Sequence, residues 1–138
     1  MKVTAKIVFT SLVLGAFLAQ GQALASEARY TDEQAIKAVL GEARGEGFDG
    51  MYAVACAIRN RGTLKGVYGA TASMEEIGPE LYQQASRAWF NSEYGGDPTL
   101  GATHWHNVER EGENYWTRKL TRTYKVHSHT FFKEPQRT

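Results

Sequence analysis

The sequence predicts an α+β domain in which helices come first and a short antiparallel β ribbon follows. Three stretches in the first two thirds of the chain carry apolar residues at the i, i+3, i+4 spacing of a buried helix face. After Asp97-Pro98 the composition shifts towards Thr, Tyr, Trp, Val and Phe, which favour strands. Helices that precede the strands, instead of alternating with them, are typical of an α+β architecture.

The chain is predicted to begin with a secretory signal peptide over residues 1–25. Lys2 and Lys6 precede an uncharged apolar run, and Ala-Leu-Ala stands before the expected cleavage point after Ala25. The apolar run is shorter than the roughly 20 residues that a membrane-spanning helix needs. We therefore expect an exported catalytic domain over residues 26–138, in the periplasm, cell envelope or extracellular space, with no stable membrane anchor after cleavage.

Composition limits the class of protein. The 138 residues have a formal net charge of +1 and no block of basic residues, so nucleic acid is not an expected partner. The single cysteine, Cys56, cannot pair within the chain. Its apolar neighbours predict a buried core residue, in preference to the nucleophile of a Cys-His pair. Nothing in the sequence favours more than a monomer.

The first helix is predicted to begin at Thr31. Thr31 and Gln34 match a capping box, in which each side chain satisfies a free backbone group at the helix start. An apolar stripe over residues 36–43 follows, and Glu42 and Glu46 flank it. Glycines surround Glu46, so we expect the helix to be interrupted there and Glu46 to lie in a loop.

Two further helices follow. An alanine-rich stripe over residues 51–58 predicts the second, and Gly62 supplies its C-terminal stop. The next segment has no clear period, and we expect a loop with one helical turn around residues 73–77. Pro79 suits the first position of the third helix, which should stop before Gly95.

The remainder predicts two strands. They lie in "GATHWHN" and in "YWTRKLTRTYKVHSHTFF", where apolar and polar residues alternate. A polar segment over residues 109–114 separates them. Of the tryptophans, Trp89 and Trp116 are assigned to the core or to a groove, and Trp105 is expected to be partly open because two histidines flank it.

Glu42 is the first candidate for chemistry. A carboxyl group beside an apolar stripe and near a second carboxyl is pushed towards its neutral form, as a general acid requires. Together, Glu42 and Glu46 would also fit glycoside hydrolysis, which often uses two carboxylates. The alternative is an exposed acid at a helix end, or an ion pair with Arg44 or Arg61.

The histidines offer a rival site. His104 and His106 form one His-x-His pair, and His127 and His129 form another. If both pairs lay on strands, each would project to one face, and two facing pairs could bind zinc. Such a site would indicate a metal-dependent amidase or peptidase. The usual zinc-ligand spacings are absent, however.

With these residues in view, the chain resembles the bacterial cell wall hydrolase family typified by the spore-cortex lytic enzyme SleB. The resemblance begins at "AIKAVLGEARGEGFDGMYAVACAIRNR", resumes at "DPTLGATHWHN" and ends at the strand that closes on His129-Thr130-Phe131. In place of a longer segment with a Phe-Pro step, this chain has a short "GTLKGVYGA". Many relatives also have a glycine where this chain has His127.

The resemblance implies a small lysozyme-like domain that acts on the glycan strands of peptidoglycan. It implies that Glu42 is the catalytic acid of a lytic transglycosylase, without a metal or other cofactor. Glu46, Thr103, Trp105, Asn107 and His129 become candidates for substrate binding. The alternatives are a zinc-dependent N-acetylmuramoyl-L-alanine amidase that uses the histidines, and a wall-binding module without catalytic activity.

Overall fold

The computed structural model describes residues 29–137, so the predicted signal peptide over residues 1–25 lies outside the described residues. The helices are α2 (Asp32–Ala43), α3 (Gly47–Arg61), α4 (Pro79–Tyr94) and the short α5 (Val108–Glu111), with a 3₁₀ helix, η1, over Tyr68–Thr71. The strands are β1 (His104–His106), β2 (Thr121–Val126) and β3 (His129–Lys133). The predicted α+β order, with helices before strands, is confirmed.

The helix boundaries follow the local signals in the sequence. The capping box at Thr31 forms, with the backbone N–H of Gln34 donating to the Thr31 hydroxyl at 3.1 Å. The chain breaks after α2 as predicted, and Glu46 is the residue that precedes the first turn of α3. α3 ends where Gly62 adopts a left-handed conformation, with φ of 67°. Pro79 opens α4.

One expectation for the connections was wrong. The helical turn predicted around residues 73–77 occurs earlier, as η1 over Tyr68–Thr71. Its Gly69 packs directly on Gly41 of α2, a contact that local sequence patterns do not reveal. The polar segment over residues 109–114 separates strands as expected, and α5, capped by the side chain of Asn107, extends into it.

The ribbon has three strands instead of the predicted two. The stretch expected to form one strand from Tyr115 to Phe132 turns at His127 and Ser128 and pairs with itself as β2 and β3. The sheet order is β1-β3-β2, with every neighbour antiparallel. β3 is therefore the central strand, and four of its five residues are buried.

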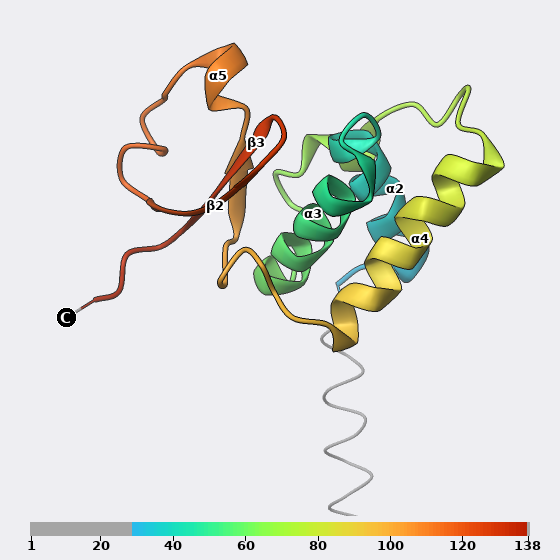
Figure 1. Cartoon of the computed structure of the whole chain (residues 1–138), viewed down its shortest axis with the longest axis horizontal. Coiled ribbons are helices and arrows are strands. Elements are labelled where there is room, and N and C mark those ends of the chain that lie inside the picture. Colours follow the sequence, from blue (N-terminus) through green and yellow to red (C-terminus); the bar gives the residue numbers. More distant parts are fainter. Residues whose placement is uncertain (1–28, 138) are drawn as a thin grey trace, which may run out of the picture.

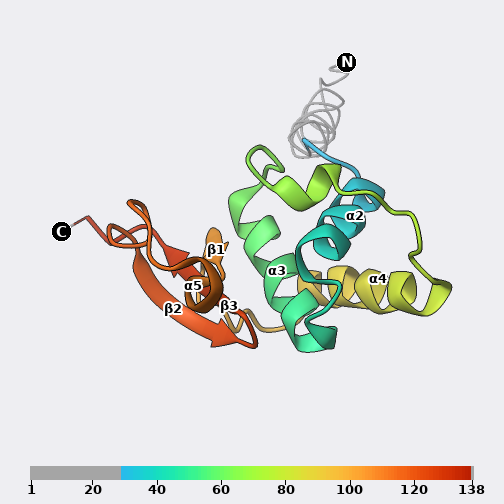
Figure 2. The same cartoon turned by 90° about the horizontal axis from the view of Figure 1, so that it is seen from above.

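The molecule has two layers (Figure 1), with the sheet on one side and the three long helices on the other. Figure 2 shows α3 lying between the sheet and the other two helices. The core is formed by the apolar faces of α2, α3 and α4, and Trp89 and Phe131 are among its largest buried side chains. Cys56 is buried, as predicted, and burial raises the pKa of its thiol to about 12, so it is not a nucleophile at neutral pH.

Candidate active site

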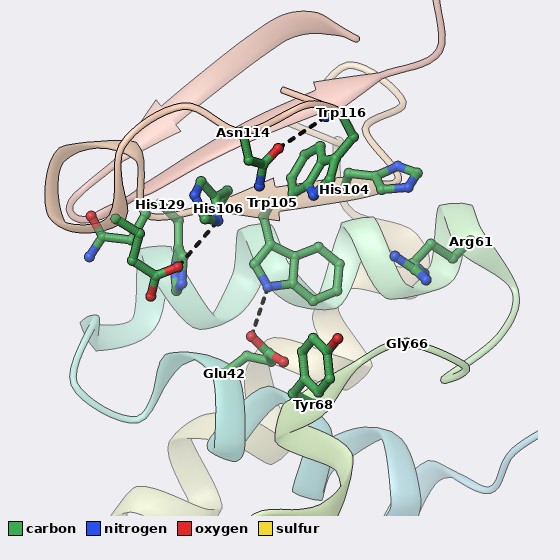
Figure 3. A pocket seen from close by; sticks show the side chains of 12 residues that line it. Glu42, Arg61, Gly66, Tyr68, His104, Trp105, His106, Asn114, Trp116 and His129 are labelled. Carbon is green, nitrogen blue, oxygen red and sulfur yellow. Dashed lines mark hydrogen bonds and ion pairs between the residues drawn. The ribbon is translucent and has the colours of Figure 1, made fainter. Parts of the chain in front are cut away.

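A cavity of about 760 Å³ lies where the helices meet the sheet. Its helical wall includes Glu42 of α2, Arg61 at the end of α3 and Tyr68 of η1. The opposite wall comes from the sheet and the connection between β1 and β2: His104, Trp105, His106, Asn107, Glu111, Asn114, Trp116 and His129. In Figure 3, Glu42 and Tyr68 lie side by side below the ring of Trp105. One carboxyl group thus faces a wall of aromatic rings and histidines.

The carboxylate of Glu42 is held by two hydrogen bonds. The backbone N–H of Gly69 donates to Oε1 at 2.7 Å, and the indole N–H of Trp105 donates to Oε2 at 3.0 Å. One donor comes from the helical layer and the other from the sheet. The alternative in which Glu42 pairs with Arg44 or Arg61 is not formed: the ion pairs within 4.0 Å among the described residues involve other carboxylates.

The close approach of η1 to α2 requires glycine at two positions. A methyl group on Gly41 would lie 2.1 Å from the carbonyl oxygen of Gly69. One on Gly69 would lie 2.6 Å from Cγ of Glu42. Real Cβ atoms do not approach backbone this closely, so these glycines let the Gly69 N–H reach the carboxylate.

Glu46 lies outside the cavity lining. Its carboxylate accepts hydrogen bonds from the backbone N–H of Ser128, at 3.1 Å, and from the Ser128 hydroxyl. Its Oε1 also lies 4.0 Å from Nδ1 of His129. Glu46 therefore binds the turn between β2 and β3 and connects it to the start of α3.

His129 lines the cavity and is otherwise buried. Burial lowers the pKa of its imidazole below the ordinary value, and this effect outweighs the opposing attraction of Glu46 and Glu42. Nδ1 is buried without a hydrogen-bond partner, and the 4.0 Å to Glu46 is too long to supply one. A neutral ring here leaves Nε2 as the nitrogen that can contact a ligand in the cavity.

The remaining predicted site residues differ in their positions. Trp105 is half-buried at the centre of the cavity wall, as expected from its neighbours. Asn107 lines the cavity, although its Oδ1 accepts a hydrogen bond from the Arg110 backbone at the start of α5. Thr103 is not part of the lining, and its hydroxyl contacts Nδ1 of His104 at 2.9 Å.

The described residues do not form the two facing histidine pairs that the rival zinc site would require. His104, His106 and His129 line the cavity, but His127 lies exposed in the turn between β2 and β3. Within residues 29–137, no three side chains of the His, Cys, Asp or Glu type are grouped as metal ligands would be. The cause is the hairpin, which sends His127 away from the face that carries His129.

Sequence reasoning missed several cavity residues. Tyr68 was not singled out, because its exposure is visible only in the folded structure. Arg61 was considered only as an ion-pair partner. Trp116 was expected on a strand and instead lies in the turns before β2, with its ring against those of His104 and His106.

No family model and no curated protein matches this sequence. Two solved structures are similar to it. The catalytic domain of the Bacillus cereus SleB protein is 26% identical, with a TM-score of 0.55 over 75% of this chain and 92% of that one. The catalytic domain of the germination-specific lytic transglycosylase SleB from Bacillus anthracis is 27% identical, with a TM-score of 0.56 over 76% and 98%.

The described chain is thus similar in fold to the SleB catalytic domains. The predicted resemblance and the α+β, lysozyme-like fold are confirmed. The structure places Glu42, which opens the Glu-Ala-Arg-Gly-Glu block, on the wall of the cavity. The second glutamate of that block, Glu46, faces the hairpin turn instead.

Proposed function

We propose that this chain is an exported peptidoglycan hydrolase that cleaves glycan strands between N-acetylmuramic acid and N-acetylglucosamine as a lytic transglycosylase. The observation that carries the proposal is the Glu42 carboxylate, oriented by two donors on the wall of a cavity lined with aromatic rings. The likeness to SleB from Bacillus anthracis, itself described as a lytic transglycosylase, supports the reaction type.

One carboxyl group is sufficient for this reaction. Protonated Glu42 gives its proton to the glycosidic oxygen as the bond from that oxygen to C1 of the muramic residue breaks. The carboxylate so formed removes the proton of the same residue's C6 hydroxyl, whose oxygen bonds to C1. The products are a free 4-hydroxyl group and a 1,6-anhydro sugar, and Glu42 regains its proton. Glu46, bound to Ser128, is not needed as a nucleophile.

The sheet wall supplies the substrate contacts. Trp105 and Trp116 line the cavity, where aromatic rings are suited to pack on sugar rings, and Nε2 of His129 and the amide NH₂ of Asn107 can bond acetamido or hydroxyl groups. We assign Glu46 a supporting role through His129 and the turn. Thr103, away from the lining, would act on substrate only through His104.

The test is a digest of purified peptidoglycan by the purified protein, with soluble products identified by mass spectrometry. We expect anhydromuramic ends from the native protein and a loss of at least about 100-fold in Glu42→Gln, because general acid catalysis is removed. Glu33→Gln is the matched control, since Glu33 lies exposed on the same helix. Full activity of Glu42→Gln would refute the proposal.

The same digest separates the two alternatives. Free peptide stems that disappear on chelation would instead indicate the zinc amidase. Binding to peptidoglycan without any soluble product would indicate a wall-binding module.

A further inference from the structure

Arg61 contacts both chain segments that supply hydrogen bonds to Glu42. Its Nη1 donates to the carbonyl oxygen of Thr103 at 3.0 Å, and its Nη2 donates to that of Lys65 at 2.7 Å. Thr103 immediately precedes β1, which carries Trp105. Lys65 lies in the short loop that leads into η1, which carries Gly69. The guanidinium group thus connects the sheet wall of the cavity with its helical wall.

The contacts fit an arginine better than any other residue. A planar guanidinium presents several N–H groups in a fixed fork, whereas a lysine ammonium is a single point charge on a flexible chain. Gly66 adopts φ of 79°, and a methyl group there would lie 3.4 Å from Nη2 of Arg61, so the loop curves closely around this side chain. Arg61 is at the last position of α3, which Gly62 terminates.

Arg61 does not act as a counter-ion held against the carboxylate. Within residues 29–137 it has no carboxylate oxygen within 4.0 Å, and Figure 3 shows it beside the ring of Trp105, away from Glu42. Its Cζ lies 5.8 Å from the centre of that ring. Burial lowers its pKa, with Glu42 opposing the shift at longer range. Partial burial of this cation therefore requires the two carbonyl contacts.

We propose that Arg61 is a positioning residue for Glu42, which fixes the Trp105 and Gly69 donors on either side of the carboxylate by binding Thr103 and Lys65 with one guanidinium group. The expected effect of Arg61 on catalysis rests on the proposed function. Its effect on the positions of the Trp105 and Gly69 donors does not, so the two effects can be tested separately.

Arg59 provides a matched control on the same helix. Its guanidinium also binds across to another element, donating to the Trp89 carbonyl oxygen and to the Ser92 hydroxyl, each at 2.8 Å. The Cζ atom of Arg59 lies 3.7 Å from the centre of the Trp89 ring, and Arg59 does not line the cavity. Each arginine is therefore associated with a different tryptophan.

The first experiment reads the geometry without any substrate. The chain has three tryptophans, so its indole N–H groups give few, well-separated signals in a proton–nitrogen NMR spectrum, and Trp105→Phe identifies one of them. We expect Arg61→Lys to shift the Trp105 signal and leave that of Trp89 in place. Arg59→Lys should do the reverse. An unchanged Trp105 signal in Arg61→Lys would overturn the proposal.

The second experiment reads catalysis. We expect Arg61→Lys to lower kcat by about 10- to 100-fold with little change in KM, because a misplaced catalytic group slows the chemical step more than it weakens binding. Arg59→Lys should keep kcat even if it lowers the melting temperature. In the Trp105→Phe background, Arg61→Lys should lower kcat by a smaller factor, since one of the donors it positions is already lost.

The outcomes are distinguishable. Equal losses of kcat in Arg61→Lys and Arg59→Lys, in step with stability, would reduce Arg61 to a structural residue and overturn the proposal. If the native protein releases no anhydromuramic product, the proposed function fails, while the indole signals still decide whether Arg61 positions the donors to Glu42.

Discussion

At the residue scale, Tyr68 shows how the cavity differs from a buried core. It is 88% exposed and lines the cavity next to Glu42. An aromatic ring left in water beside a carboxyl group has no packing role in the folded chain. Under the proposed function, this ring would stack against a sugar ring of the glycan strand.

Tyr68→Ala should therefore weaken substrate binding. We expect KM for soluble glycan fragments to rise by about 3- to 10-fold, with kcat less affected, as loss of one stacked ring implies. Tyr68→Phe should behave like the native protein. Tyr94→Ala is the control, because Tyr94 is 87% exposed on α4 and outside the cavity. Equal KM values for Tyr68→Ala and Tyr94→Ala would rule out the stacking role.

His129 makes stability depend on pH. Its pKa is lowered in the folded protein, chiefly by burial, although Glu46, Glu42 and Glu111 oppose the shift and His106 adds to it. At pH values above the unfolded pKa of about 6.5, both states are neutral and the group has no effect. Below it the unfolded state takes up the proton first, so stability falls with falling pH.

The urea midpoint should therefore drop between about pH 7.5 and about pH 5, and it should drop less in His129→Gln. Some decrease should remain, because burial and Arg61 also lower the pKa of His104. The quantity compared is the change in the urea midpoint between the two pH values within each protein. A loss of stability in His129→Gln that is equal at both pH values therefore does not affect it. The same pH-dependent decrease in both proteins would exclude His129 as its source.

At the element scale, the β2–β3 hairpin is the largest difference between prediction and structure. Strand-favouring residues lie on both sides of the turn, and no glycine or proline marks it, so local patterns indicated one strand. His127 occupies the turn with φ of 47°, a left-handed conformation that glycine adopts more easily.

His127→Gly should stabilise the protein. Relief of the left-handed strain gives an expected gain of about 1 kcal/mol in the free energy of unfolding, measured by urea denaturation. His127→Asn should give a smaller gain, since asparagine also tolerates this conformation. Loss of stability in His127→Gly would show that the histidine side chain contributes more than the strain costs.

At the scale of the whole molecule, a few polar contacts connect the helices with the sheet. Glu46 is the clearest, because its partly buried carboxylate binds the backbone and hydroxyl of Ser128 across the layers. Asn60 adds a second connection, donating to the Ala102 carbonyl oxygen at 2.9 Å.

In the described part of the chain, no helix is both long and apolar enough to span a bilayer.

Glu46→Ala should loosen the sheet from the helices. We expect a loss of about 1 to 3 kcal/mol in unfolding free energy, as for buried hydrogen bonds to a charged group. Amide hydrogen exchange should accelerate most in β2 and β3. Asp49→Ala, at an exposed position in the first turn of α3, is the control. Unchanged exchange in the hairpin would remove Glu46 from this structural role.

The sequence by itself determined the local structure of the helices. Capping at Thr31, the glycine stop at Gly62 and Pro79 at a helix start act through backbone groups within a few residues, so their patterns are readable without the fold. The apolar stripe that Glu42 flanks, together with the family resemblance, identified this residue as the candidate acid.

Only the tertiary structure decided what surrounds that acid. The Gly69 and Trp105 donors lie 27 and 63 residues away from Glu42 in the chain. Glu46 and Glu42 are near neighbours in sequence, yet one binds a turn 82 residues away and the other faces the cavity. Hydrogen bonds of this kind depend on how two layers dock, and periodicity describes only which face of each element is apolar.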